Sequence, residues 1–137
     1  MKVIGFNFSK ISAEKLKKNT DKINIKTEID VSEIKEIKKG IINTKDDILE
    51  VSFKYDVKYE PDFANILING EILVTLESKL AKEVLKKWKK KQMPEEFRVF
   101  LFNVILRKAA LKALYSEEEL NLPLHIPMPS VKKSGEK

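Results

Sequence analysis

Residues 48–77 read ILEVSFKYDVKYEPDFANILINGEILVTLE, and apolar side chains alternate with polar ones through most of this stretch. Residues two positions apart lie on the same face of a β-strand, so the alternation predicts strands with one buried face. Leu49 to Tyr59 form the clearest run, and a second run extends from Ile66 to Leu76. Pro61 predicts a turn between them. The stretch therefore predicts two consecutive strands of a sheet.

Asn69 and Gly70 lie inside the second of these strands and allow two interpretations. Asn-Gly is a strong signal for a two-residue hairpin turn. However, the apolar residues on either side keep one phase through Gly70, which indicates a single long strand with a glycine at a bend. We prefer the continuous strand.

Two further alternating runs precede residue 48. Their apolar positions are Ile4, Phe6 and Phe8 in the first run, and Ile23, Ile25, Ile29 and Val31 in the second. Val31 and Ile34 are out of phase, which indicates either a β-bulge or a short helical turn over residues 34–41, before a loop at 43–47. Strands are thus expected over about residues 2–77.

From residue 78 the apolar period changes to that of a helix. One stripe of apolar side chains consists of Leu80, Val84, Leu85 and Trp88, and lysines fill the other face. Ser78 suits the N-cap position, and Pro94 predicts that this helix ends near Met93.

A second helix is predicted from Pro94 to about Tyr115, with two glutamates in its first turn. Residues 97–106 are apolar nearly all round, so several sides of this helix should be buried. One face of a sheet covers only one of these sides. The apolar residues on the other sides are explained either by an oligomer interface or by additional core packing.

Prolines at positions 123, 127 and 129 exclude a helix in the tail and favour an extended strip over residues 120–131. Strands followed by helices, over about 2–77 and 78–115, predict an α+β fold. The chain of 137 residues, with 42% hydrophobic residues, suits one domain spanning residues 1–137.

The formal net charge of +6 is concentrated in one segment. Residues 79–91 contain seven lysines and one glutamate, so the rest of the chain is neutral overall. This segment suggests a nucleic-acid or other anionic partner, although a lysine-rich helix face is more often simply solvated. Lysine outnumbers arginine 25 to 2, which disfavours a protein that reads base edges.

The composition also excludes several classes of protein. Without cysteine there is no disulfide framework and no thiolate zinc site. His125 is the single histidine, with no ligand or catalytic partner nearby in sequence, and the four glycines are too scattered for a phosphate-binding loop. We therefore expect no enzyme, no metal and no cofactor. The absence of a signal-peptide pattern and of a long apolar stretch favours the cytoplasm.

The order of predicted elements resembles the SecB family of export chaperones. The likeness rests on residues 48–62, 63–77 and especially 97–131, FRVFLFNVILRKAALKALYSEEELNLPLHIPMPSV, where a helix is followed by an apolar, proline-containing segment. The resemblance implies a four-stranded antiparallel sheet with two helices packed on one face. It also implies a homo-oligomer, dimeric or tetrameric.

As a function, the resemblance implies an ATP-independent chaperone that holds non-native polypeptides in apolar grooves. A translocation component or an antitoxin would then be the further partner. The residues that would contact a client are Leu67, Leu73, Val84, Leu85 and Trp88, and those that would form the oligomer interface are Phe100, Leu101, Val104 and Ile105. Leu67 and Leu73 are equally suited to a subunit interface, and Trp88 to the core.

Overall fold

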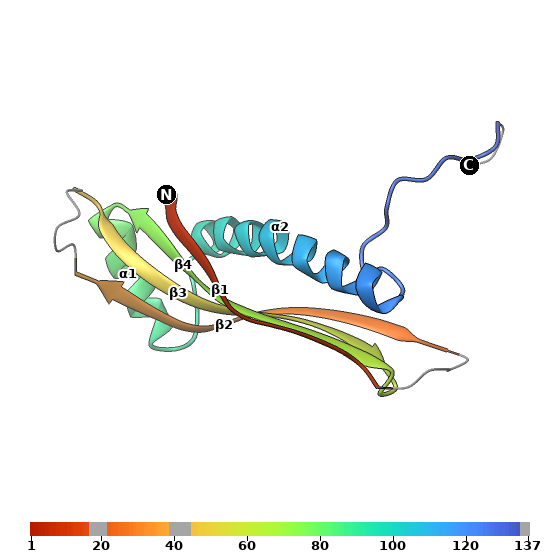
Figure 1. Cartoon of the computed structure of the whole chain (residues 1–137). Coiled ribbons are helices and arrows are strands. Elements are labelled where there is room, and N and C mark those ends of the chain that lie inside the picture. Colours follow the sequence, from red (N-terminus) through yellow and green to blue (C-terminus); the bar gives the residue numbers. More distant parts are fainter. Residues whose placement is uncertain (17–21, 39–44, 135–137) are drawn as a thin grey trace.

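The computed structural model describes residues 1–16, 22–38 and 45–134 (Figure 1). Four strands are followed by two helices along the chain. The strands are β1 (Lys2–Lys15), β2 (Asn24–Ile37), β3 (Asp47–Glu60) and β4 (Ala64–Leu76), and the helices are α1 (Ser78–Trp88) and α2 (Glu95–Leu120). This order confirms the α+β fold predicted from the sequence.

Neighbouring strands are all antiparallel, and their order in the sheet is β1-β4-β3-β2. The stretch that alternates most regularly thus forms the two central strands, β3 and β4. Central strands are covered on both edges by neighbours, which explains why nearly every apolar residue in them is buried. β1 and β2 form the two edges of the sheet.

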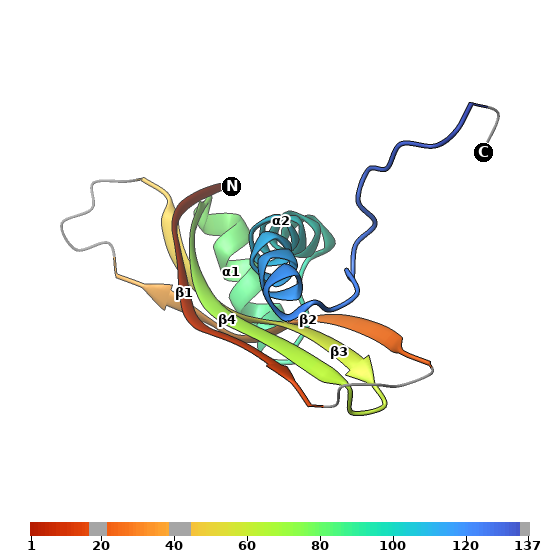
Figure 2. The ribbon, with the colours of Figure 1, turned by 45° about the vertical axis from the view of Figure 1, so that its right-hand side comes forward.

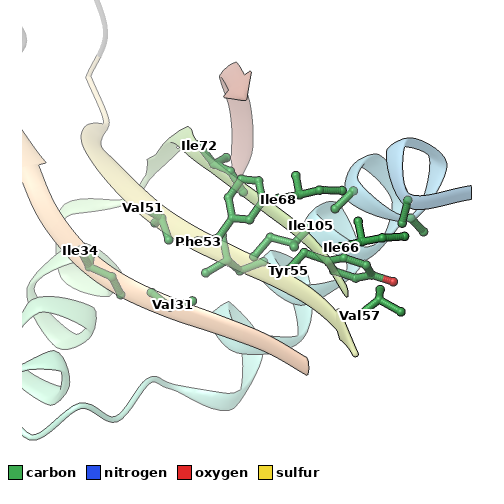
Figure 3. Close-up of a cluster of buried hydrophobic side chains, with 14 of the residues drawn as sticks. Val31, Ile34, Val51, Phe53, Tyr55, Val57, Ile66, Ile68, Ile72 and Ile105 are labelled. Carbon is green, nitrogen blue, oxygen red and sulfur yellow. The ribbon is translucent and has the colours of Figure 1, made fainter. Parts of the chain in front are cut away.

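The core lies on one face of this sheet. The odd-numbered residues of β3 and the even-numbered residues of β4 point to this core face, and the buried residues of both helices join the same cluster. Figure 2 shows α1 and α2 on the same side of the curved sheet. Figure 3 shows Ile105 of α2 beside Tyr55 and Ile68. The opposite side, which we call the outer face, carries no helix and is mainly polar.

Gly70 lies within β4, which runs without interruption from Ala64 to Leu76. The continuous strand is therefore confirmed. A Cβ atom on Gly70 would lie 2.4 Å from the carbonyl oxygen of Asn7 and 2.7 Å from the ring of Phe53. Glycine is required here because the neighbouring backbone and this ring approach the strand closely.

The irregularity after Val31 is a shift in register between β2 and β3, at Val31–Glu33. β2 continues as a strand to Ile37, so the bulge is confirmed and a helical turn at residues 34–37 is wrong. One extra residue in a strand restores the apolar phase, and this places both Val31 and Ile34 on the core face. Residues 43 and 44 of the predicted loop at 43–47 lie outside the described residues.

The start of α1 differs from the prediction. Glu77 occupies the N-cap position and makes no side-chain hydrogen bond to the helix. The hydroxyl of Ser78 instead donates to Asp47 on β3, with 3.2 Å between the oxygen atoms. Ser78 therefore connects the helix to the sheet and is not its cap.

The end of α1 also comes earlier than Met93. Lys91 adopts a left-handed backbone conformation with φ 58°, and its N–H bonds to the carbonyl of Trp88 at 2.8 Å. The next N–H, of Gln92, bonds to the carbonyl of Lys87 at 3.1 Å. These two bonds form a Schellman motif, which ends the helix before Pro94 is reached.

α2 continues to Leu120, so the prediction that it ends near Tyr115 is wrong. Residues 116–120 form its last turns, and the tail begins at Asn121. Asn121 has φ 54°, and the N–H of Leu122 bonds to the carbonyl of Glu117 at 2.9 Å. Asparagine tolerates this left-handed conformation, and the segment after it leads away from the helix (Figures 1 and 2).

Candidate functional site

The five residues predicted to bind a client lie on two different faces of the sheet. Leu67 and Leu73 belong to β4 and point to the outer face. Val84, Leu85 and Trp88 belong to α1 and pack against the core face, where Val84 is fully buried. The sheet separates the two groups, so within one chain they do not line a common groove. That part of the prediction is corrected.

Leu67 and Leu73 are also distant from each other. Asn69 and Glu71 occupy the same face between them, and six residues of a strand span about 20 Å. The side chain of Leu73 covers Gly5 of β1, where an added Cβ would lie 3.2 Å from a Leu73 methyl group. Each leucine is thus a separate apolar position on a polar surface.

Trp88 lies at the edge of an open hollow of about 350 Å³. We call it the Trp88 hollow; its lining consists of Asp30, Val31, Ser32, Trp88, Lys91, Met93 and Phe102. Four of these side chains are apolar, and the Lys91 Nζ lies 4.5 Å from the centroid of the Trp88 ring. The end of α1, the start of α2 and the edge strand β2 therefore meet around one apolar depression.

The strand that borders the Trp88 hollow has a free edge. β2 pairs with β3 on one side, and in the described ranges no strand pairs with its other side. The bulge lies at this point, and the Ser32 hydroxyl donates to the carbonyl of Ser52 at 3.2 Å. An edge strand beside an apolar depression can take up an extended peptide, because the backbone supplies hydrogen bonds and the depression accepts a side chain.

The four predicted interface residues of α2 are also divided. Leu101 and Ile105 are fully buried within the single chain, so they belong to the core and are not available to a second subunit. Phe100 and Val104 are only half-buried. Buried residues recur at every fourth position from Phe97, and because four residues exceed one turn the buried side rotates along the helix.

The rotation leaves apolar side chains exposed along α2, at positions that wind around the helix. We call them the α2 outer stripe; its most exposed members are Val99, Leu106, Leu111 and Tyr115. Leu111 is 64% exposed and Tyr115 is 68% exposed. Such a stripe on a helix indicates a contact surface. Val99 and Leu106 belong to the apolar run noted at 97–106, whereas Leu111 and Tyr115 lie beyond this run and were not predicted.

A buried polar cluster, which the sequence analysis did not detect, joins α2 to the tail. The Glu117 side chain is fully buried, and its Oε1 lies 2.8 Å from Nδ1 of His125. The backbone N–H of His125 donates to Glu117 Oε2 at 3.1 Å. The other ring nitrogen of His125 lies 2.7 Å from the hydroxyl of Tyr55. Glu117 is one of three consecutive glutamates at 117–119, and nothing in the sequence indicates that one of the three is buried.

Tyr59 completes the cluster. Its hydroxyl donates to the carboxylate of Glu117 and lies 2.6 Å from the carbonyl oxygen of Pro123. Burial, followed by the negative charge of Glu117, raises the pKa of Tyr55 to about 12. Burial, the hydrogen bond to Glu117 and its charge together raise the pKa of Tyr59 still further. Both phenols therefore remain protonated donors around the carboxylate at neutral pH.

No protein-family model matches the chain, and no curated protein is significantly similar to it. Neither α1 nor α2 is long and apolar enough to cross a membrane, and they are the only helices in the described part of the chain. Within residues 1–16, 22–38 and 45–134, no three His, Cys, Asp or Glu side chains gather as metal ligands.

Proposed function

We propose that this chain is a cytoplasmic, ATP-independent chaperone that binds extended or non-native polypeptides, as its SecB-like order of elements implies. The observation that carries the proposal is the Trp88 hollow beside the free edge of β2. Pairing with an edge strand uses only backbone groups, and apolar contact is non-directional. Both interactions accept many sequences, which is what a holding chaperone requires.

Exposed apolar surface on a stable scaffold further supports this function. The α2 outer stripe is the largest group of exposed apolar side chains on one helix, and the charged residues of the chain counteract its cost in solubility. We propose that two chains pack these stripes together in a homo-oligomer. The free edge of β2 would stay open to a client, because the proposed subunit contact uses α2 and not β2.

The chaperone proposal is tested by light scattering with lysozyme that aggregates after reduction of its disulfides. We expect the wild-type chain to suppress aggregation at substoichiometric amounts. Trp88→Ser removes the aromatic anchor of the hollow and should weaken client binding about tenfold or more. Leu67→Ser, on the outer face, is the matched control and should retain full activity.

Two results would overturn these statements separately. Aggregation that the wild-type chain leaves unchanged at every ratio would exclude the chaperone function. Equal activity of Trp88→Ser and Leu67→Ser, with both variants as stable as wild type in urea, would place the client site away from the Trp88 hollow.

A further inference from the structure

The solvent side of α1 carries a row of lysines that the proposed chaperone function does not use. We call it the lysine row; it consists of Lys79, Lys82, Lys86, Lys89 and Lys90, all of them exposed. At about 100° per residue these positions fall on one side of the helix, opposite the buried residues Ala81 and Val84. The row is therefore directed away from the core.

The lysine row has little neutralising charge on its own helix. Glu83, the single acidic residue of α1, pairs with Lys87 beside the row at 3.5 Å. In the described part of the chain, no ion pair joins a member of the row to a carboxylate. Glu77, Glu83 and Glu96 gather near Lys79, so the positive charge is strongest from Lys82 to Lys90.

We propose that the lysine row binds the phosphate backbone of nucleic acid without regard to base sequence. The row extends over about 16 Å at 1.5 Å per residue. A DNA duplex carries one negative charge per about 1.7 Å of its helix axis, both strands counted, so a row of this length meets several phosphates at once. Lysine contributes point charges to such contacts and lacks the fork with which arginine reads guanine.

The structure favours nucleic acid over an anionic membrane. A helix that lies on a membrane inserts its apolar side chains below the headgroups. In α1 the apolar side faces the sheet, where Ala81 and Val84 are buried and Leu80, Leu85 and Trp88 pack against the core. The lysine row therefore presents charge alone to a partner, and a dense, regular polyanion matches this surface best.

Fluorescence anisotropy with a labelled 20-base-pair DNA duplex, over a range of salt concentrations, tests the proposal. We expect binding whose logarithm falls linearly with the logarithm of salt, through counterion release. The triple variant Lys82→Gln/Lys86→Gln/Lys90→Gln should reduce the magnitude of this slope by about 3 and weaken binding at low salt by about tenfold or more. A labelled single-stranded RNA of equal length shows which form of nucleic acid binds more tightly.

The matched control removes the same charge from the outer face of the sheet. Lys10→Gln/Lys26→Gln/Lys54→Gln changes three exposed lysines on β1, β2 and β3. Equal losses in the two triple variants would show that net charge alone drives binding, and would overturn the proposal. It would also fail if neither probe bound at low salt, or if phosphatidylserine vesicles bound more tightly than both. Suppression of lysozyme aggregation should persist in both variants, which separates this test from that of the chaperone.

Discussion

The carboxylate of Glu117 and the imidazole of His125 lie 2.8 Å apart in a site from which solvent is excluded. Glu117 belongs to the last turns of α2, and His125 follows the helix in the proline-containing segment. A carboxylate accepts hydrogen bonds, so Nδ1 of His125 donates to Glu117, and Nε2 forms a hydrogen bond with the hydroxyl of Tyr55. The segment after α2 is thus held by a satisfied polar network.

Replacement of Glu117 by alanine should strongly destabilise the fold. The variant leaves the backbone N–H and the ring N–H of His125 without their buried acceptor, whereas the Tyr59 hydroxyl keeps the carbonyl oxygen of Pro123. We expect the free energy of unfolding in urea to fall by about 3 kcal/mol. Glu118→Ala, at an exposed neighbouring position, should change it by less than about 0.5 kcal/mol. Similar effects of the two substitutions would contradict the role of the buried carboxylate.

Replacement of His125 by alanine should release the segment after α2. Leu122 and Ile126 pack on the core, but the ring of His125 provides the bonds to both Glu117 and Tyr55. We expect hydrogen exchange of the amides at 122–126 to accelerate about tenfold or more, measured by mass spectrometry. Met128→Ala is the control, because this side chain is 56% exposed, and it should leave the exchange rate of these amides unchanged. Unaltered protection in the His125 variant would mean that apolar packing alone holds the segment.

A methyl group at Gly70 should be poorly tolerated. The added Cβ would meet the backbone oxygen of Asn7 at 2.4 Å, and neither the backbone of β1 nor the Phe53 ring can retreat without disturbing the sheet. We expect Gly70→Ala to lower the free energy of unfolding by about 3 kcal/mol. Gly5→Ala should cost less, because its closest contact, at 3.2 Å, is the flexible end of Leu73. The reverse order of the two variants in urea denaturation would contradict this explanation.

Alkaline pH should weaken the fold through Tyr55 and Tyr59. Their pKa values are raised on folding, so the unfolded chain loses these protons first as the pH rises above 10. The stability that they contribute is complete below pH 10 and then declines, up to about pH 12 for Tyr55 and to higher pH for Tyr59, by at most about 1.4 kcal/mol per pH unit for each phenol. Urea denaturation from pH 8.5 to 11.5 measures the decline. In Tyr55→Phe the free energy of unfolding should fall less steeply with pH. The same slope as in the wild-type chain would contradict the contribution of this phenol.

The α2 outer stripe should determine the oligomeric state. Leu106→Glu/Leu111→Glu introduces two charges on this stripe without touching the buried side of the helix. If the stripe is the subunit interface, the mass in solution, measured by light scattering after gel filtration, should fall from that of an oligomer towards a monomer. Lys26→Glu/Lys54→Glu, on the outer face of the sheet, should keep the wild-type mass. An identical mass for all three proteins would exclude the stripe.

Local sequence patterns predicted most of the strands and helices. The alternation from Leu49 to Tyr59 and the unbroken phase through Gly70 predicted two long strands, and the change of period at residue 78 located α1. These predictions succeeded because side-chain periodicity follows from the local geometry of the backbone. The helix ends were less well predicted, because the left-handed residues that end them are Lys91 and Asn121, and neither is a glycine.

Which residues act together depends on how distant segments pack in the folded chain. Tyr55 and His125 are 70 positions apart, and the Trp88 hollow combines β2, α1 and α2. Leu67 and Trp88 look equally apolar in sequence, yet the sheet separates them. The order β1-β4-β3-β2 and the rotation of the buried side of α2 decide what is core, edge or exposed. Both arise from packing between distant segments, which no local pattern of residues records.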